Sequence, residues 1–266
     1  MGPVLMNRRT TVVQHIRDLR GRNRSALVKA ANGRHYVRKA LDAFGDSDFL
    51  FNEAFASQLG SALGLSFPDW AELIGGNDDV MHPVSDSTRC SRPSFFGSEL
   101  VSGELVEYLP GTWYSNVRNR IEAYCCLLFD LWCNHADARQ AVYQDRGSHS
   151  FHLYFVDHDQ LFAAEERDSI QQRIAQTRYL DLRLYNQPVE SVQLVLRPFA
   201  AQIDCLASNE LEVMMAGVPS HWGSADHRQS VVCALKRRSR MLGAYIDSIV
   251  EFATAQAQTG SGLGRL

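Results

Sequence analysis

Apolar and polar residues alternate in the first part of the chain as they do in β-strands. The alternation is loose over residues 10–17 and clearer over 26–30 and 35–40. Between these last two runs stand Asn32 and Gly33, residue types that favour a tight turn between antiparallel strands. The pattern therefore predicts three strands, the second and third joined as a hairpin.

A helix is predicted next, because large apolar residues recur at every fourth position over residues 46–63. Side chains at this spacing share one side of a helix, and here they are Phe51, Phe55, Leu59 and Leu63. Gly64 stands where a helix commonly ends in the left-handed conformation, and Pro68 follows it. Glu53 lies on a different side of this helix from the apolar stripe.

A polar segment rich in turn-forming residues, 75–94, predicts a loop or a weakly ordered insert. Beyond it, the apolar runs 95–101 and 104–110 predict two further strands. Ser102 and Gly103 separate these runs, and we interpret them as a hinge between two lobes.

The second half of the chain predicts helices around one hairpin. Residues 116–133 are apolar on nearly all sides, which is typical of a helix at the centre of a folded unit. A polar cluster and an apolar strand follow, and they predict a hairpin within 134–162. Residues 165–254 have helical spacing, and the Gly- and Gln-rich tail 255–266 is expected to be disordered.

This order of elements predicts an α+β fold of two lobes with the active site in the cleft between them. Residues 1–101 would form a small strand-rich lobe, and residues 102–254 a mainly helical one. The chain has 266 residues, of which 45% are hydrophobic, so it is long enough to bury a substantial core.

Charge and composition argue against several functions. A net charge of −3 gives little attraction for nucleic acid, and the basic run 236–240 is more typical of a solvated helix face. No segment approaches the ~18 apolar residues of a membrane-spanning helix, so we expect no membrane partner and a cytoplasmic location. The six cysteines form no CxxC pair and predict free thiols in a reducing compartment; a zinc site is the weaker alternative.

Two acidic positions flank the predicted hairpin. Asp137 follows the buried helix, and Asp157 directly follows the apolar strand FHLYFV. A hairpin can bring both into one cleft, and phosphoryl transfer needs such a pair. One carboxylate orients the acceptor hydroxyl and takes its proton, while the other holds Mg²⁺ on the nucleotide phosphates. Each aspartate alone is equally typical of a turn or a helix cap, but the pair in this order favours catalysis.

Five segments in collinear order resemble the short bacterial HipA-like kinases, distant relatives of the protein kinases and phosphoinositide kinases. They read RGRNRSALVKAANGRHYVRK, NEAFASQLGSALGLSFPDW, FFGSELV, NHADARQAVY with the strand ending in VDHDQLF, and VPSHW. The likeness extends from about residue 20 to 250. It implies a protein-kinase-like fold with ATP and Mg²⁺ as cofactors. It also implies transfer of the γ-phosphate to a hydroxyl, of a protein Ser or Thr or of a small molecule.

In that family a turn covers the ATP phosphates, and the resemblance places Gly21 and Ser25 in this turn. Lys39 ends the strand that follows and would bind the α- and β-phosphates, with Glu53 as its ion-pair partner. Lys29 is the alternative lysine, since the chain has only Lys29, Lys39 and Lys236. Lys39 is favoured because it alone is followed by the helix that bears Glu53. A solvated lysine and an exposed helix carboxylate are the structural alternatives.

The resemblance assigns the transfer chemistry to residues of the second half. Asp137 would be the catalytic carboxylate, and Asp157 the metal ligand. Gln140, or less favourably Asn134, would add a neutral oxygen ligand. Asp159 would add a further carboxylate ligand, or alter how the following loop moves.

Three features of this region leave alternatives open. Arg139 would stabilise charge on the transferred phosphoryl group or, equally, form a structural salt bridge. Val142 stands where protein kinases have a metal-binding Asn, and Asp159 stands where related sequences often carry Gly. The phosphate turn contains one glycine, Gly21. These departures motivate a second hypothesis, a pseudokinase that binds nucleotide or a partner protein as a regulatory module.

Overall fold

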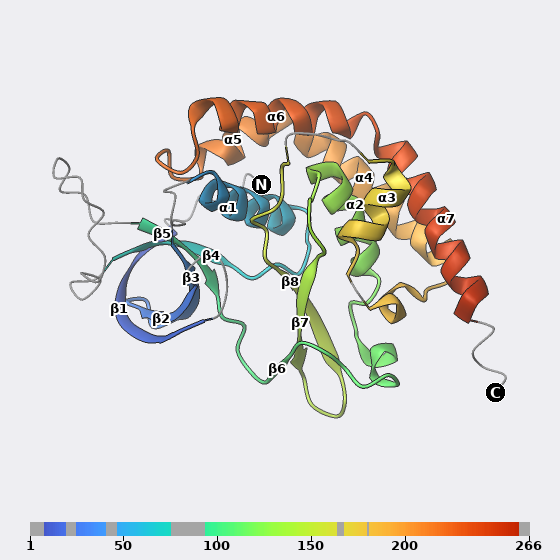
Figure 1. Ribbon diagram of the computed structural model, residues 1–266, viewed down its shortest axis with the longest axis horizontal. Coiled ribbons are helices and arrows are strands. Elements are labelled where there is room, and N and C mark those ends of the chain that lie inside the picture. Colours follow the sequence, from blue (N-terminus) through green and yellow to red (C-terminus); the bar gives the residue numbers. More distant parts are fainter. Residues whose placement is uncertain are drawn as a thin grey trace.

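A computed structural model of the protein describes residues 8–19, 25–40, 47–75, 94–163, 168–179 and 181–260. Seen end-on at the left of Figure 1, five strands form a closed barrel in the order β1-β2-β3-β5-β4. The barrel closes because β1 pairs in parallel with β4, whereas its other neighbouring strands are antiparallel. The strands are β1 (Arg9–Asp18), β2 (Ala26–Ala30), β3 (His35–Lys39), β4 (Trp70–Ile74) and β5 (Ser94–Glu99).

The predicted strands 10–17, 26–30 and 35–40 are confirmed as β1, β2 and β3, and 95–101 as β5 with shorter bounds. The turn between β2 and β3 uses Gly33 at a φ of +81°, a conformation that glycine adopts without strain. β4 was not predicted, because its sequence WAELI is buried along most of its length and shows little alternation.

The alternation of β3 decides where its side chains point. Tyr36 packs inside the barrel with Val28 and Leu73, whereas Val37 and Lys39, on the opposite face, line a cavity outside it. Pairing with β5 sets the register and places Lys39 opposite Phe96.

The predicted helix over 46–63 is α1 (Asp48–Ala62), and its stripe of large apolar residues is fully buried. Gly64 has a φ of +76°, and the Leu65 amide donates to the Gly60 carbonyl, so the helix ends in the predicted left-handed cap. The chain then turns back so that Phe67 lies against Gly60, where a side chain would collide with its ring.

A second sheet has the order β6-β7-β8, with β6 (Leu105–Val106), β7 (Gln140–Asp145) and β8 (Phe151–Val156). The predicted hairpin within 134–162 is therefore confirmed as β7 and β8. The prediction of a strand over 104–110 is wrong beyond two residues, because only Leu105 and Val106 pair with β7. Gly103, just before β6, has a φ of +102°.

The helix predicted over 116–133 begins later than expected. A short 3₁₀ helix, η1 (Trp113–Asn116), is followed by Val117 in extended conformation, bridged to Phe151 beside β8. Only then does α2 (Glu122–Cys133) begin. Its residues are buried on nearly all sides, as expected for a central helix.

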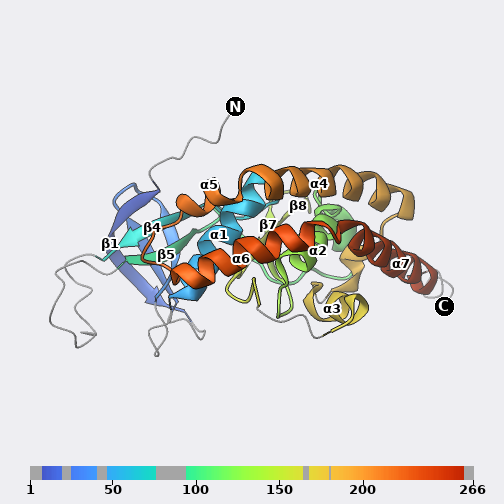
Figure 2. The same ribbon diagram turned by 90° about the horizontal axis from the view of Figure 1, so that it is seen from above.

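The remaining elements are helical, as predicted for 165–254. They are α3 (Ile170–Thr177), η2 (Leu182–Tyr185), α4 (Val189–Asn209), α5 (Leu211–Ala216), α6 (Ala225–Ser239) and α7 (Leu242–Gly260). α3, α4, α6 and α7 all contact α2. Figures 1 and 2 show α5 and α6 passing over α1, so the helical part reaches the helix that packs beside the barrel. Residues 255–260 of the tail predicted as disordered instead continue α7 to Gly260, because Ala and Gln favour a helix. The rest of that tail lies outside the described residues.

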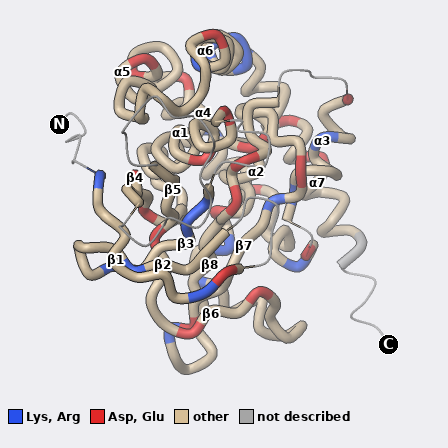
Figure 3. The backbone as a smooth tube through the Cα atoms, turned by 60° about the vertical axis from the view of Figure 1, so that its left-hand side comes forward, with Lys and Arg blue, Asp and Glu red and all other residues tan. Residues whose placement is uncertain are grey.

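Three further features of the described residues are the absence of a membrane-spanning helix, the state of the cysteines and the distribution of charge. No described helix has the length and apolar character needed to span a bilayer. Their cysteines are free thiols, with Cys125, Cys126 and Cys133 buried in α2. Basic and acidic residues are interspersed along the described chain (Figure 3), and the basic run of α6 is divided. In that run Lys236 pairs with Glu212, and Arg238 is buried.

Candidate active site

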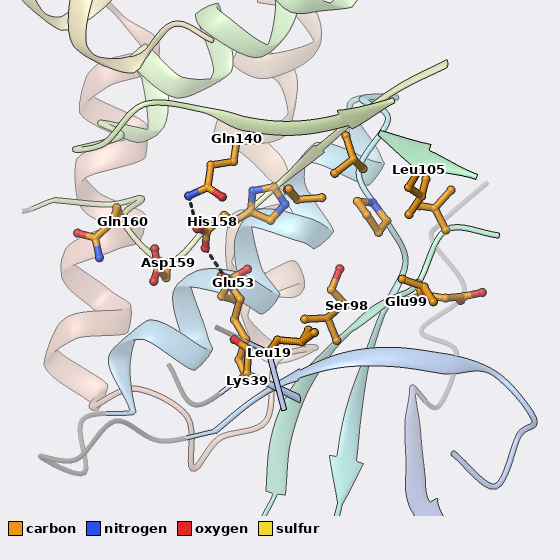
Figure 4. A pocket seen from close by; sticks show the side chains of 18 of the residues that line it. Leu19, Lys39, Glu53, Ser98, Glu99, Leu105, Gln140, His158, Asp159 and Gln160 are labelled. Atoms are coloured by element: carbon orange, nitrogen blue, oxygen red, sulfur yellow. Dashed lines mark hydrogen bonds and ion pairs between the residues drawn. The ribbon is translucent and has the colours of Figure 1, made fainter. Parts of the chain in front are cut away.

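A cavity of about 570 Å³ lies where the barrel, α1 and the β7–β8 hairpin meet. In Figure 4, Gln140, Asp159 and Gln160 lie on one side of it, and Ser98, Glu99 and Leu105 lie on the other. Most of the site residues predicted from sequence line this cavity: Ser25, Lys39, Glu53, Asp137, Gln140, Asp157 and Asp159. Gly21 lies outside the described residues.

Lys39 connects three segments that are far apart in the sequence. Its Nζ donates to Glu53 of α1, and it lies 2.5 Å from Oδ1 of Asp157, the residue after β8. Burial would lower the pKa of Lys39, but the two carboxylates beside it raise that pKa above its ordinary value, so the ammonium stays charged. Burial raises the pKa of Glu53 to about 7 against the opposing effect of Lys39. The exposed-lysine and exposed-glutamate alternatives do not describe this pair, since both side chains are buried.

Lys29, the other strand lysine near the barrel, takes a different position. It lies on β2 opposite His35 of β3, and it is not among the residues that line the cavity. The structure therefore brings Lys39, and not Lys29, to the acidic residues.

Asp157 is held from two sides. Its second oxygen, Oδ2, accepts a hydrogen bond of 2.7 Å from Nε2 of Gln140, the first residue of β7. Both oxygens of the carboxylate thus face N–H donors. Each carboxylate oxygen has a second lone pair, so Asp157 can bind a cation while it accepts these hydrogen bonds.

Three carboxylates lie close enough to share a cation. One oxygen each of Glu53, Asp157 and Asp159 lies within 4.8 Å of the others. Such hard oxygen ligands suit Mg²⁺ or Mn²⁺, so the residues fit the implied metal. Asn134 does not join them: it caps α2 in the left-handed conformation, and its amide donates to the Ala163 carbonyl.

Asp137 lies on the same cavity wall, in the segment between α2 and β7. It is exposed, and its Oδ1 accepts a hydrogen bond of 2.7 Å from the Ala138 amide. That contact holds the carboxylate close to its own backbone, and the side chain stays exposed at the cavity.

Arg139 lies behind the cavity and does not line it. Its guanidinium forms a buried ion pair with Asp130 of α2, in which Nε lies 3.0 Å from Oδ2. Its remaining nitrogen donates to the carbonyls of Val156, at 3.2 Å, and Asp157, at 3.1 Å. Of the two alternatives expected for Arg139, the structure contains the structural salt bridge, because the side chain is turned inward to Asp130 and away from the cavity.

This buried arginine supports an unusual backbone. Asp157 has a φ of +63°, a left-handed conformation that is rare outside glycine. The next residue, His158, accepts from Arg139 at Nδ1 over 2.8 Å and stacks on Phe67 with ring centroids 4.3 Å apart. Burial and the neighbouring Arg139 hold the pKa of His158 well below its ordinary value, so its ring is neutral.

Sequence reasoning missed two residues behind the cavity. Asp130 stands in the apolar run CLLFDLWC, and a carboxylate there signals a buried charge that requires a partner. Asn52 precedes Glu53 on α1, and its amide donates to the carbonyls of Asp159 and Leu161. No spacing rule in the sequence connects Asn52 with a loop more than one hundred residues away.

The whole fold is similar to those of solved protein kinases. A Helicobacter pylori proinflammatory kinase, CtkA, matches with a TM-score of 0.55 at 11% identity, over 94% of this chain and 96% of its own. The Golgi casein kinase with Mn and ADP bound matches with a TM-score of 0.53 at 12% identity, over 92% of this chain and 72% of its own. A further structure of the Golgi casein kinase gives a TM-score of 0.52 at 12% identity, over 92% and 71%.

The chain has a kinase-like fold. No protein-family model and no curated protein sequence matches it, so the HipA-like resemblance rests on the sequence motifs alone. The mixed arrangement of strands and helices agrees with the predicted α+β class.

Proposed function

We propose that the protein is an ATP-dependent phosphotransferase of the HipA-like kind that uses Mg²⁺ or Mn²⁺. The observation that carries this proposal is the position of Lys39 between Glu53 and Asp157. In kinases a lysine–glutamate pair and a metal-binding aspartate must both be in place for transfer. The kinase-like fold supports the same reading.

The lining of the cavity suits a nucleotide. Aliphatic residues of the lining would suit an adenine base, and they include Leu19, Val37, Leu100, Val101 and Leu105. The acidic residues and Lys39 suit the phosphates and their cation. In this proposal the barrel and α1 serve as the smaller lobe, and the helical part serves as the larger one.

Each polar residue has a separate task in the proposed transfer. Lys39 binds the phosphates, and Asp137 orients the acceptor hydroxyl and takes its proton. The acceptor oxygen bonds to the γ-phosphorus as the bond from that phosphorus to the β–γ bridging oxygen breaks, and ADP leaves. Asp157, with Asp159 and Gln140, would hold a divalent cation, which supplies positive charge to the phosphates. Lys39 contacts two carboxylates, Glu53 and Asp157, and Asp159 lies beside them, so a cation would offset the excess negative charge.

The proposed acceptor is a Ser or Thr hydroxyl of a protein, with a small-molecule hydroxyl as the variant. A second candidate function is a pseudokinase that binds nucleotide or a partner in a regulatory role. Val142 in place of a metal-binding Asn favours it.

The test is incubation of the purified protein with Mg²⁺ or Mn²⁺ and γ-labelled ATP, alone and with a cell lysate. Asp137→Ala and Asp157→Ala should each reduce label transfer by about 100-fold or more. Asp145→Ala, at the far end of the same hairpin, is the matched control and should retain transfer. Asp157→Ala should also weaken metal–ADP binding by roughly tenfold, whereas Asp137→Ala should leave it near wild type. Nucleotide binding without transfer would support the pseudokinase. No binding of any nucleotide would exclude the kinase and a pseudokinase that binds nucleotide.

A further inference from the structure

The amide of Asn52 has only one orientation that satisfies its surroundings. Its nitrogen lies 3.2 Å from the Asp159 carbonyl and 3.0 Å from the Leu161 carbonyl. Carbonyl oxygens accept and cannot donate, so both must face the NH₂ group of the amide. Oδ1 therefore points the other way, and it lies 2.8 Å from Nε2 of His227 on α6.

The Asn52 orientation in turn decides the role of His227. Oδ1 can only accept, so Nε2 of His227 must carry the hydrogen and donate it. An imidazole provides this donor when it is neutral with its proton on Nε2, and also when it is doubly protonated. A continuous chain of hydrogen bonds thus runs from α6 through α1 to the loop that bears Asp157 and Asp159.

His227 is itself held in place by the start of α1. Its backbone amide donates to Oγ of Ser224, the cap of α6, and the Ser224 amide donates to Asp48 over 3.0 Å. Nδ1 of His227 lies 3.6 Å from the other oxygen of Asp48. The ring meets Phe51 edge-on, with centroids 5.6 Å apart. The donor is therefore presented to Asn52 from a rigid position.

The loop needs such support because of its charge. One oxygen each of Asp157, Asp159 and Glu53 lies within 4.8 Å of the others, and these like charges repel one another. Lys39 offsets one of the negative charges and leaves an excess. The loop is also irregular, with Asp157 in a left-handed conformation. Asn52 fastens the part of the loop that Arg139 does not reach, namely the carbonyls of residues 159 and 161.

We propose that His227 is a positioning residue that holds the Asp157–Asp159 loop in its metal-binding arrangement by fixing the Asn52 amide. The proposal rests on the proposed phosphotransferase function for its catalytic consequence. His227 is neither among the residues that line the cavity nor in the acidic cluster, and Asn52 is the residue that connects its side chain to the loop by hydrogen bonds. Neighbouring residues of α1 then have complementary tasks: Glu53 orders Lys39, and Asn52 orders the loop.

Two substitutions of His227 distinguish the effect of its hydrogen-bond donor from the effect of its side-chain bulk. His227→Gln places an amide nitrogen near the position of Nε2 and preserves a donor, whereas His227→Leu preserves bulk and removes it. Because His227 is partly exposed, both variants should fold. Full-length wild-type protein and both variants are titrated with Mn²⁺ in the presence of ADP, with binding followed by electron paramagnetic resonance. The affinity for ADP without metal is measured in parallel.

We expect His227→Leu to weaken Mn²⁺ binding roughly tenfold, as for a lost hydrogen bond to a buried polar group. ADP binding without metal should stay unchanged, and His227→Gln should bind Mn²⁺ within about threefold of wild type. Adding His227→Leu to Asn52→Leu should cause little further loss, because both act on one contact. Normal Mn²⁺ binding by His227→Leu, or equal impairment of His227→Gln, would overturn the proposal.

A ligand-free measurement distinguishes failure of this proposal from failure of the proposed function. Amide hydrogen exchange of residues 158–163 should be roughly tenfold faster in His227→Leu than in wild type, and near wild type in His227→Gln. If wild type binds no nucleotide but this exchange pattern holds, the proposed function fails and the positioning role stands. Identical exchange in all three proteins would refute the positioning role, whatever the protein binds.

Discussion

Nζ of Lys39 lies 2.5 Å from Oδ1 of Asp157, although 118 positions separate the two residues in the chain. The contact joins the last residue of a barrel strand to the first residue after the β7–β8 hairpin. Glu53 of α1 holds the same ammonium from the other side. One side chain thereby sets the relative position of barrel, helix and hairpin at the cavity.

Replacement of this lysine tests its assignment directly. Lys39→Met should lower phosphate transfer by about 100-fold or more, because it removes the cation that faces the phosphates. Lys29→Met, a change of the same chemistry on the neighbouring strand, should leave transfer within about twofold of wild type, since Lys29 does not line the cavity. Transfer of labelled phosphate measures both. A selective loss in the Lys29 variant would reverse the assignment.

The buried pair of Asp130 and Arg139 predicts a non-additive effect on stability. Arg139→Met leaves a buried carboxylate without its partner and should lower the free energy of unfolding by about 3–5 kcal/mol. The double change Asp130→Leu with Arg139→Met removes both charges and should recover most of that loss. Lys236→Met, which breaks the exposed pair with Glu212, should cost less than about 1 kcal/mol.

Chemical denaturation measures these variants, and additive losses in the double variant would contradict the prediction. Even if it is stable, the double variant should transfer phosphate poorly. It lacks the donor to the Val156 and Asp157 carbonyls that supports the left-handed backbone of Asp157.

A buried histidine predicts a pH dependence of stability. Burial, and then Arg139, hold the pKa of His135 well below its ordinary 6.5. In the unfolded chain this histidine takes up a proton below about pH 6.5, and in the folded protein it does not. Its contribution to stability is therefore complete above pH 7 and is lost as the pH falls, by up to about 1.4 kcal/mol per pH unit.

His135→Leu should flatten the profile between pH 7 and pH 5.5 relative to wild type. The difference between the stability profiles of wild type and variant gives the contribution of His135, because the buried Glu53 and His158 are present in both proteins. The free energy of unfolding in denaturant, without metal or nucleotide, is the quantity to measure. Parallel profiles would show that His135 takes up its proton without cost in the folded state.

Two helical glycines predict opposite effects of the same substitution. An alanine Cβ at Gly60 of α1 would lie 2.3 Å from the Phe67 ring, so Gly60→Ala should destabilise by about 1–3 kcal/mol. At Gly243 of α7 no atom lies within 4 Å of the added Cβ. Gly243→Ala should therefore stabilise by up to about 1 kcal/mol through helix propensity. Thermal or denaturant unfolding compares them, and a shift of the same sign in both would be inconsistent with the packing at Phe67.

Sequence periodicity predicted those elements whose apolar residues lie mainly on one face. The β2–β3 hairpin and α1 alternate or repeat cleanly, and their bounds were predicted within about two residues. β4 is apolar with little alternation, so the closure of the barrel could not be anticipated. The start of α2 was misplaced because Val117 pairs with Phe151, a tertiary contact that overrides local helical spacing.

The candidate site likewise contains residues that the sequence predicted and residues that it did not. Lys39, Glu53 and Asp157 meet as their motif order suggested, because each lies at a fixed place on a regular element. The two alternatives for Arg139 stayed open because residue type alone does not tell whether a guanidinium points toward the cavity or toward Asp130. The link between Asn52 and His227 joins elements whose relative placement depends on the packing of α6 over α1, and no local pattern contains that information.

The closed barrel limits where insertions and deletions can occur in this protein. Every barrel strand is paired on both sides, so inserting or deleting one residue within β3 would require compensating shifts around the whole ring. Because side chains alternate between faces, an uncompensated shift by one position would turn Lys39 into the barrel and away from Asp157. Changes of length should therefore be tolerated in the turns between the strands, while the strands themselves keep a fixed count of residues.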